Sequence, residues 1–160
     1  MKDMKTILLV GVLLMTFQCD ALACSCIGEI TVKKEIKRSD AVFTGSVISI
    51  ERFTVRDTLL GTDHVVSTSF NRVKIKITSI YKGELRSETV DVITGIGGGD
   101  CGFAFEKGKE YIVYADSKTQ FSPLGNETAR YLSTHICKRT RALDKSEITQ
   151  IEKLRKPIKH

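Results

Sequence analysis

The sequence predicts a mainly β fold organised as one domain. Short segments in which apolar and polar residues alternate recur along the chain, and this alternation is typical of half-buried strands. Glycines stand between these segments and indicate turns. The chain has 160 residues, which is one domain's worth, and its 41% apolar and 28% charged residues are ordinary for a globular protein. Such a composition excludes long disorder, collagen and a coiled coil.

Five segments have the pattern of strands. The clearest is Val-Lys-Ile-Lys-Ile at 73–77, in which we expect the valine and isoleucines to face inward and the lysines to face solvent. The predicted strands are 41–50, 68–81, 89–93, 111–115 and 129–137. Five strands with long connections favour a small closed sheet over a sandwich, and the OB barrel has this number of strands.

Two helices are expected to flank this sheet. The first, residues 31–38, is short and charged. The second, at about 144–156, has Asp144 as N-cap with Glu147 three residues later, which is the pattern of a capping box. Its apolar residues form one narrow stripe, which predicts that this helix packs onto the barrel. The stripe consists of Ile148, Ile151 and Leu154.

Residues 1–23 have the features of a signal peptide. Two lysines precede an apolar stretch at 7–17, and Ala-Leu-Ala at 21–23 forms a cleavage site. The stretch is shorter than the roughly 20 apolar residues that span a bilayer. We therefore predict an exported protein, secreted or extracellular, or of the periplasm or cell envelope in a bacterium. The mature chain would be a single domain over residues 24–160.

A lipoprotein is the competing interpretation, because Cys24 directly follows the predicted cut. Lipoprotein signals favour an aliphatic residue three positions before that cysteine, whereas Ala21 stands there and Leu22 follows. This order favours ordinary signal peptidase. We expect contact with a membrane only if Cys24 carries a lipid.

Export also determines how the cysteines are interpreted. Cys19 leaves with the signal, and four cysteines remain: Cys24, Cys26, Cys101 and Cys137. An even number in an oxidising compartment predicts two disulfides. A bond within the Cys-Ser-Cys segment would close a very tight ring, so each of its cysteines should reach a different distant partner. A zinc site is the rival interpretation, but the spacing lacks the paired C-x-x-C of structural zinc sites.

Little in the chain predicts catalysis or a cofactor. The three histidines, at 64, 135 and 160, are not in H-E-x-x-H spacing, and no G-x-S-x-G occurs. The glycine-rich segment 95–102 lacks the Lys-Ser/Thr of a phosphate loop, and we interpret it as a flexible loop leading into Cys101. The net charge of +6 suits a polyanion, although a solvated surface without a ligand is the simpler interpretation. We predict no enzyme activity, no cofactor of its own and no nucleic-acid partner.

The predicted mature N-terminus, Cys24-Ser25-Cys26, has distinctive chemistry. An α-amino group has a pKa of about 8, so a useful fraction is unprotonated at neutral pH. That nitrogen and the carbonyl oxygen of Cys24 lie in a five-membered chelate geometry. Zinc in a metalloprotease keeps an open position for water or substrate. A backbone wedge that presents both atoms there would displace the catalytic water, and two disulfides would make the wedge rigid.

Five segments together carry a resemblance to a known family. They are Cys24-Ser25-Cys26, Ile-Tyr-Lys-Gly at 80–83, Cys101-Gly102, 110–115 and Ile136-Cys137. In this combination the chain resembles the N-terminal, inhibitory domain of the tissue inhibitors of metalloproteinases, which belong to the netrin-like domain group. The N-terminal Cys-x-Cys, with distant partner cysteines in this order, is the most specific element. The resemblance extends over roughly residues 24–140.

The resemblance implies a fold and an activity. The fold would be an OB barrel with flanking helices, with disulfides Cys24–Cys101 and Cys26–Cys137. Cys24 would chelate the zinc of a partner metalloprotease, and Ser25 would enter the primary specificity pocket of that protease. Cys26 and Ile27, where the family's inhibitory ridge continues, would also contact it. The implied function is that of a secreted inhibitor of zinc metalloendopeptidases.

The sequence also departs from that family. It has neither the third disulfide nor the second, cysteine-rich domain of the animal members, and Ile-Gly-Glu-Ile-Thr at 27–31 replaces a proline-rich stretch. The alternative function is therefore a non-inhibitory netrin-like module of the extracellular space or envelope, with or without a lipid anchor, that binds a polyanion or another protein. An acylated Cys24 would have no free amine to offer to zinc.

Overall fold

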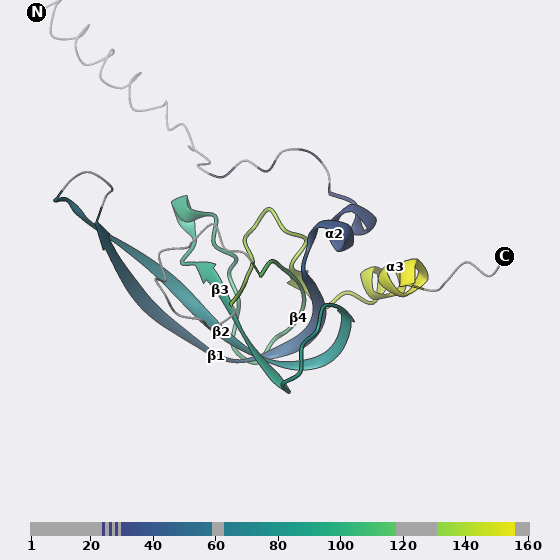
Figure 1. Cartoon of the computed structure of the whole chain (residues 1–160). Helices are drawn as coiled ribbons and strands as arrows, with labels where there is room; N and C mark the ends of the chain where they lie inside the picture. Colours follow the sequence, from purple (N-terminus) through teal and green to yellow (C-terminus); the bar gives the residue numbers. More distant parts are fainter. Residues whose placement is uncertain are drawn as a thin grey trace, which may run out of the picture.

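The computed structural model describes residues 24, 26, 28, 30–58, 63–117 and 131–155. In these residues the chain is mainly β, with two α-helices and one six-stranded sheet (Figure 1). The predicted signal peptide at 1–23 lies outside the described residues.

The elements follow one another in a simple order. They are α2 (Val32–Arg38), β1 (Ala41–Thr58), β2 (Val65–Lys82), β3 (Thr89–Gly95), the 3₁₀ turn η1 (Gly98–Asp100), β4 (Glu110–Ala115), β5 (Leu132–Ser133), β6 (Arg141–Ala142) and α3 (Lys145–Arg155). The strand order in the sheet is β5-β3-β2-β1-β4-β6. Neighbouring strands are antiparallel, except that β5 runs parallel to β3.

The prediction of five strands is wrong in number. Four of the predicted strands are found as β1 to β4, but the segment predicted as a strand at 129–137 contains only the two residues of β5 within its described part. There the chain turns, and the backbone N–H of Lys138 donates to the carbonyl oxygen of His135 at 3.0 Å. The sixth strand, β6, was not predicted.

Strands β1 and β2 are much longer than the strands β3 and β4 that flank them in the sheet. They pair with each other over their whole length, whereas β4 pairs only with 41–46 of β1 and β3 only with 70–76 of β2. Residues 54–58 of β1 and 65–69 of β2 pair only with each other, and they extend as a two-stranded arm away from the rest of the protein (Figure 1). At the base of this arm the rings of Phe53 and Phe70 lie 5.8 Å apart, and the Arg72 guanidinium lies 5.1 Å from the Phe53 ring centre.

Two apolar clusters cover the two faces of the sheet. The larger one contains Phe43, Val73 and Ile75, with residues of β3 and β4. The predicted inward position of Val73 and Ile75 is confirmed, and the lysines between these positions are exposed. The second cluster packs α2 and α3 against the opposite face of β1 and β4. It contains Val32, Val42, Ile112, Tyr114 and Ile151.

Helix α3 packs as predicted but is capped differently. Asp144 accepts a hydrogen bond from the backbone N–H of Ser146 at 2.8 Å, as an N-cap residue does. Glu147 does not complete a capping box, because its buried carboxylate binds Tyr114 and Arg139 instead. In the predicted apolar stripe Ile151 is buried, whereas Leu154 is 45% exposed, so the stripe is narrower than expected.

The Tyr-Lys-Gly segment at the end of β2 has a structural role. The Lys82 ammonium donates to the carbonyl oxygens of Ile36 at 2.8 Å, Lys37 at 3.0 Å and Ser39 at 2.5 Å. Carbonyls at the C-terminal end of a helix lack partners within the helix, and a cation there is stabilising. Gly83 follows with φ of +90°, and a Cβ there would lie 2.8 Å from a backbone oxygen. This segment therefore fixes α2 onto the end of β2.

Candidate site at the disulfide-linked N-terminus

Two disulfides tie the N-terminal segment to the sheet. They join Cys24 to Cys101 and Cys26 to Cys137, residues 77 and 111 positions apart in the sequence. This is the pairing that the family resemblance implies. Because all four sulfurs are in disulfides, none of them is a thiolate that could bind zinc. Ser25 and Ile27, the other two predicted contact residues, lie outside the described residues.

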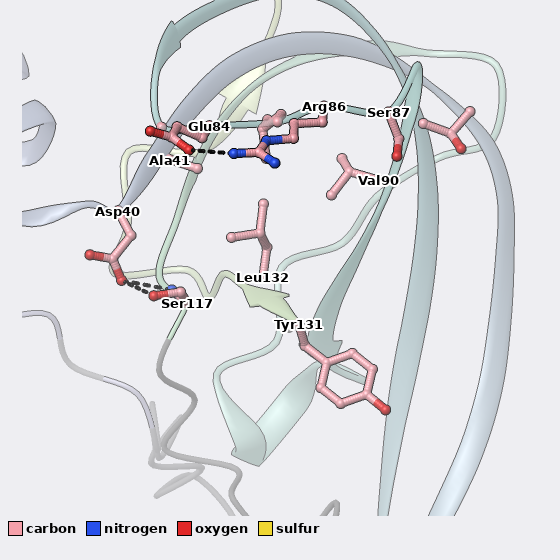
Figure 2. A pocket seen from close by; sticks show the side chains of 12 residues that line it. Asp40, Ala41, Glu84, Arg86, Ser87, Val90, Ser117, Tyr131 and Leu132 are labelled. Carbon is pink, nitrogen blue, oxygen red and sulfur yellow. Dashed lines mark hydrogen bonds and ion pairs between the residues drawn. The ribbon is translucent and has the colours of Figure 1, made fainter. Parts of the chain in front are cut away.

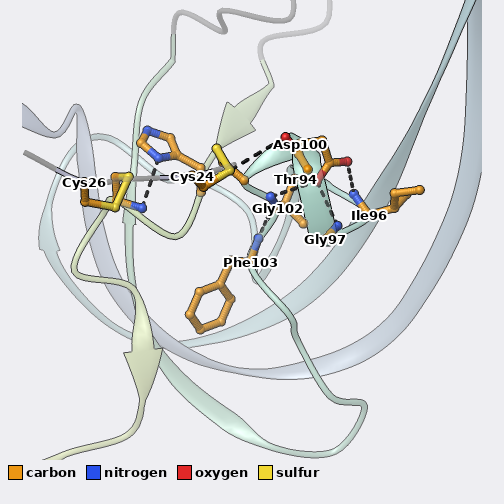
Figure 3. The surroundings of a disulfide bond; sticks show 12 residues. Cys24, Cys26, Thr94, Ile96, Gly97, Asp100, Gly102 and Phe103 are labelled. Atoms are coloured by element: carbon orange, nitrogen blue, oxygen red, sulfur yellow. Dashed lines mark hydrogen bonds between the residues drawn. A yellow bond between two sulfur atoms is a disulfide. The ribbon is translucent and has the colours of Figure 1, made fainter. Parts of the chain in front are cut away.

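The loop that carries Cys101 is built around the carboxylate of Asp100 (Figure 3). This carboxylate accepts hydrogen bonds from the backbone N–H groups of Ile96 at 2.6 Å, Gly97 at 2.9 Å and Gly102 at 3.0 Å. Burial by itself would raise the pKa of Asp100, but these backbone hydrogen bonds outweigh it, and the pKa lies below its ordinary value. The carboxylate stays ionised at neutral pH and holds the loop in one shape.

The glycines of this loop allow a close approach that larger residues would prevent. A Cβ on Gly102 would lie 2.3 Å from the backbone of Gly95, and a Cβ on Gly95 would lie 2.6 Å from the Asp100 carboxylate. The loop that the sequence predicts to be flexible is hydrogen-bonded at Asp100 and closely packed at Gly95 and Gly102. Gly95 and Gly102 are required because the chain folds tightly back on itself around Asp100, whereas a Cβ on Gly97 or Gly99 would meet nothing within 4 Å.

The second anchor, Cys137, lies in a turn that is hydrogen-bonded to the first anchor. The backbone N–H of Ile136 donates to the carbonyl oxygen of Cys101 at 3.0 Å, and that of Cys137 donates to Nδ1 of His135 at 3.2 Å. Burial and the nearby charge of Lys138 lower the pKa of His135, so the imidazole is neutral and can accept this bond. The two anchors thus hold a fixed position relative to each other.

Buried ion pairs support the chain that follows Cys137. The Lys138 ammonium, with its side chain only 2% exposed, lies 2.7 Å from Asp116 and 3.3 Å from Glu35, which is fully buried in α2. Removing one partner of a buried pair is strongly destabilising because the other charge is left uncompensated. Nothing in the sequence pattern of α2 distinguished Glu35 from its exposed neighbours, apart from its position on the same face as Val32.

A separate hollow lies at the other end of β3, away from the disulfides (Figure 2). Its volume is about 380 Å³, and its apolar lining includes Leu85, Val90 and Leu132, with Leu132 pointing into the centre. Two carboxylates lie at its rim, but each is already engaged: Asp40 accepts from the Ser117 hydroxyl at 2.6 Å, and Glu84 lies 3.4 Å from Arg86. The arrangement does not place a free acid and base together.

The described residues contain no candidate metal centre. Among them, no group of three or more His, Cys, Asp or Glu side chains is arranged to hold a metal ion. Nor does the described part of the chain contain a helix long and apolar enough to cross a bilayer. No protein-family model and no curated protein matches this chain.

Proposed function

We propose that the mature protein, beginning at Cys24, is a secreted inhibitor of zinc metalloendopeptidases. The observation that carries this proposal is that both cysteines of the Cys-x-Cys are bonded to anchors in the fold, and that the turn of the second anchor is hydrogen-bonded through Ile136 to the first anchor, Cys101. Cys26 is exposed and Cys24 half-buried, so the segment lies at the surface. A segment that is already rigid loses little conformational entropy on binding, which favours tight association.

The proposed chemistry belongs to the backbone of Cys24. After cleavage its amine and carbonyl oxygen would chelate the zinc of the protease, and Ser25 would enter the specificity pocket with Cys26 and Ile27 beside it. The metal is the partner's, and the inhibitor needs no cofactor and performs no reaction. Zinc sites in hydrolases keep one coordination position open, and a chelating backbone would fill it in place of water.

The Cys24–Cys101 disulfide bears on the lipoprotein alternative. A lipoprotein cysteine carries its lipid on the sulfur as a thioether, and the same sulfur cannot also form a disulfide. Because the Cys24 sulfur is bonded to Cys101, our proposal takes Cys24 with a free amine and no lipid, in a protein that is exported without a membrane anchor.

The finer architecture that we propose is a closed, netrin-like OB barrel. In the open strand order β5 and β4 lie far apart, but Asp116, directly after β4, forms an antiparallel bridge with Ser133 of β5. The two backbone hydrogen bonds of this bridge measure 3.0 and 2.9 Å. This contact supports closure, because it joins one edge strand of the sheet to the end of β4.

The decisive experiment compares two N-termini. Protein starting at Cys24 should inhibit members of a panel of zinc endopeptidases, whereas protein with one alanine added before Cys24 should bind on the order of a thousandfold more weakly. The added residue turns the amine into an amide, which is a poor zinc ligand. Circular dichroism and mass spectrometry should show the same fold and both disulfides in the two proteins. Equal inhibition by both would exclude chelation.

A second function is favoured by one observation on α2. This helix exposes four cations on one side, of which Arg38 lies 3.6 Å from the single acidic residue of the helix, Glu35, which is buried with Lys138. The cations are Lys33, Lys34, Lys37 and Arg38. Such a stripe suits an anionic polysaccharide in the extracellular space. If no protease is inhibited, the alternative is a module that binds an anionic polysaccharide. It would be supported if the protein binds a sulfated polysaccharide, if this binding weakens with salt, and if it is lost when the three lysines are changed to glutamine.

A further inference from the structure

One arginine connects the N-terminal segment to the C-terminal helix. Nη1 of Arg139 donates to the carbonyl oxygen of Ile30 at 2.6 Å. The same guanidinium donates from Nε to Oε1 of Glu147 at 3.0 Å and from Nη2 to Oε2 at 2.7 Å. Glu147 belongs to α3, and its side chain is only 2% exposed. Arg139 therefore links the chain at Ile30 to the C-terminal helix α3.

The position of Arg139 is determined by Glu147. The Tyr114 hydroxyl, which is fully buried, donates to Oε1 of Glu147 at 2.8 Å, and Arg141 donates to Oε2 at 3.2 Å. Burial opposes ionisation of Glu147, but the hydrogen bonds from Arg139 and Tyr114 outweigh it and lower its pKa. An ionised carboxylate with two fixed oxygens orients the planar guanidinium, which leaves Nη1 directed at Ile30.

Between Cys26 and Ile30, the described part of the N-terminal segment is held at both of its ends. The segment borders a surface hollow of about 300 Å³, lined on one side by Cys26, Gly28 and Ile30 and on the other by residues 136–141. The Cys26–Cys137 disulfide holds one end of this short segment, and Arg139, two residues after Cys137, holds the other end at Ile30. Loss of either restraint would let the segment change its direction over the hollow.

We infer that Arg139 is a positioning residue that fixes the N-terminal segment at Ile30 and so limits how the chain runs on from the Cys26–Cys137 disulfide, and that α3 acts on this segment through the pair Arg139–Glu147. This inference rests on the proposed inhibitory function, because a wedge must enter the protease cleft at one angle. A chelating segment that is free to swing would lose entropy on binding, and its affinity would fall.

The variants Arg139→Lys and Arg141→Lys form a matched pair. Both keep a positive charge beside Glu147, but only Arg139 also binds Ile30. Lysine has no planar fork and cannot serve Glu147 and Ile30 together. We expect Arg139→Lys to weaken inhibition about tenfold or more, which is the scale of one lost charged hydrogen bond. Arg141→Lys should inhibit like the unaltered protein, and thermal unfolding would verify that both are folded.

Amide hydrogen exchange at Cys26, Gly28 and Ile30 provides a second readout that needs no protease. Faster exchange at these amides in Arg139→Lys, but not in Arg141→Lys, supports the inference. If the unaltered protein inhibits no protease, that result refutes the proposed function and leaves the exchange result to decide the inference. Unchanged exchange and unchanged inhibition in Arg139→Lys would overturn it. If Arg139→Lys does not fold, Glu147→Gln removes the ionised partner that orients Arg139 and is judged by the same two measurements.

Discussion

Removing the Cys26–Cys137 disulfide should take away a large part of the stability of the domain. The two disulfides join residues 77 and 111 positions apart, for which the chain-entropy relation gives about 4.5 and about 4.8 kcal/mol. The two loops overlap, since Cys24 and Cys26 are close in sequence. With Cys24–Cys101 intact, the second bond closes an effective loop of roughly 40 residues, which corresponds to about 4 kcal/mol. Domains are typically stable by about 5–15 kcal/mol, so this loss leaves a marginal fold.

The assay is urea unfolding of Cys26→Ser, Cys137→Ser and the double variant, followed by circular dichroism without reductant. At an m-value of about 2 kcal/mol/M, the midpoint should fall by about 2 M in all three, because each change breaks the same bond. Alkylation followed by mass spectrometry should place the one free thiol of each single variant at the partner cysteine. A double variant that loses about twice as much as either single one, or a loss below about 1 kcal/mol, would refute the reasoning.

Two further predictions concern the Cys101 loop and α3. Gly102→Ala should destabilise the protein by about 1–3 kcal/mol, because its Cβ would lie 2.3 Å from the backbone of Gly95; Gly99→Ala, where a Cβ meets nothing within 4 Å, should change the melting temperature little. The stability contributed by Glu147 should be present above its ordinary pKa of 4.5 and be lost as the pH falls through its lower folded pKa. Glu147→Gln should therefore reduce the difference in unfolding midpoint between pH 7 and pH 3, and an unchanged difference would contradict this.

The sequence predicts strands best where burial alternates along them. In 73–77 Val73 and Ile75 are buried and Ile77 is partly buried, so hydrophobic periodicity locates the strand and its faces. The arm is different, because residues at 65–68 are exposed on both faces and no periodic burial marks them as a strand. The segment 129–137 shows the opposite failure. Its apolar and β-branched residues predict a strand, but the Cys137 disulfide and the turn after His135 override this local preference.

Charged residues of the interior were the least predictable part of the site. Glu35, Lys138 and Glu147 look like surface residues in the sequence, since acidic and basic residues are seldom fully buried without partners. Some of their partners are distant in sequence: Glu35 and Lys138 meet across about a hundred residues, and Tyr114, whose hydroxyl donates to Glu147, lies 33 residues before it. The cysteine spacing, by contrast, excluded a bond within Cys-Ser-Cys, and the family resemblance implied which of the two remaining pairings occurs.

The long separations of the two disulfides also determine when the N-terminal segment can acquire its structure. A chain is synthesised from its N-terminus, so Cys24 and Cys26 are made first, and their partners follow 77 and 111 residues later. At roughly 5–20 residues per second this is a delay of several seconds, during which both thiols have no native partner. Native pairing therefore depends on thiol–disulfide exchange, which takes seconds to hours and is much slower than hairpin formation. We therefore expect the N-terminal segment to be fixed to the sheet only after the strands of the sheet have paired.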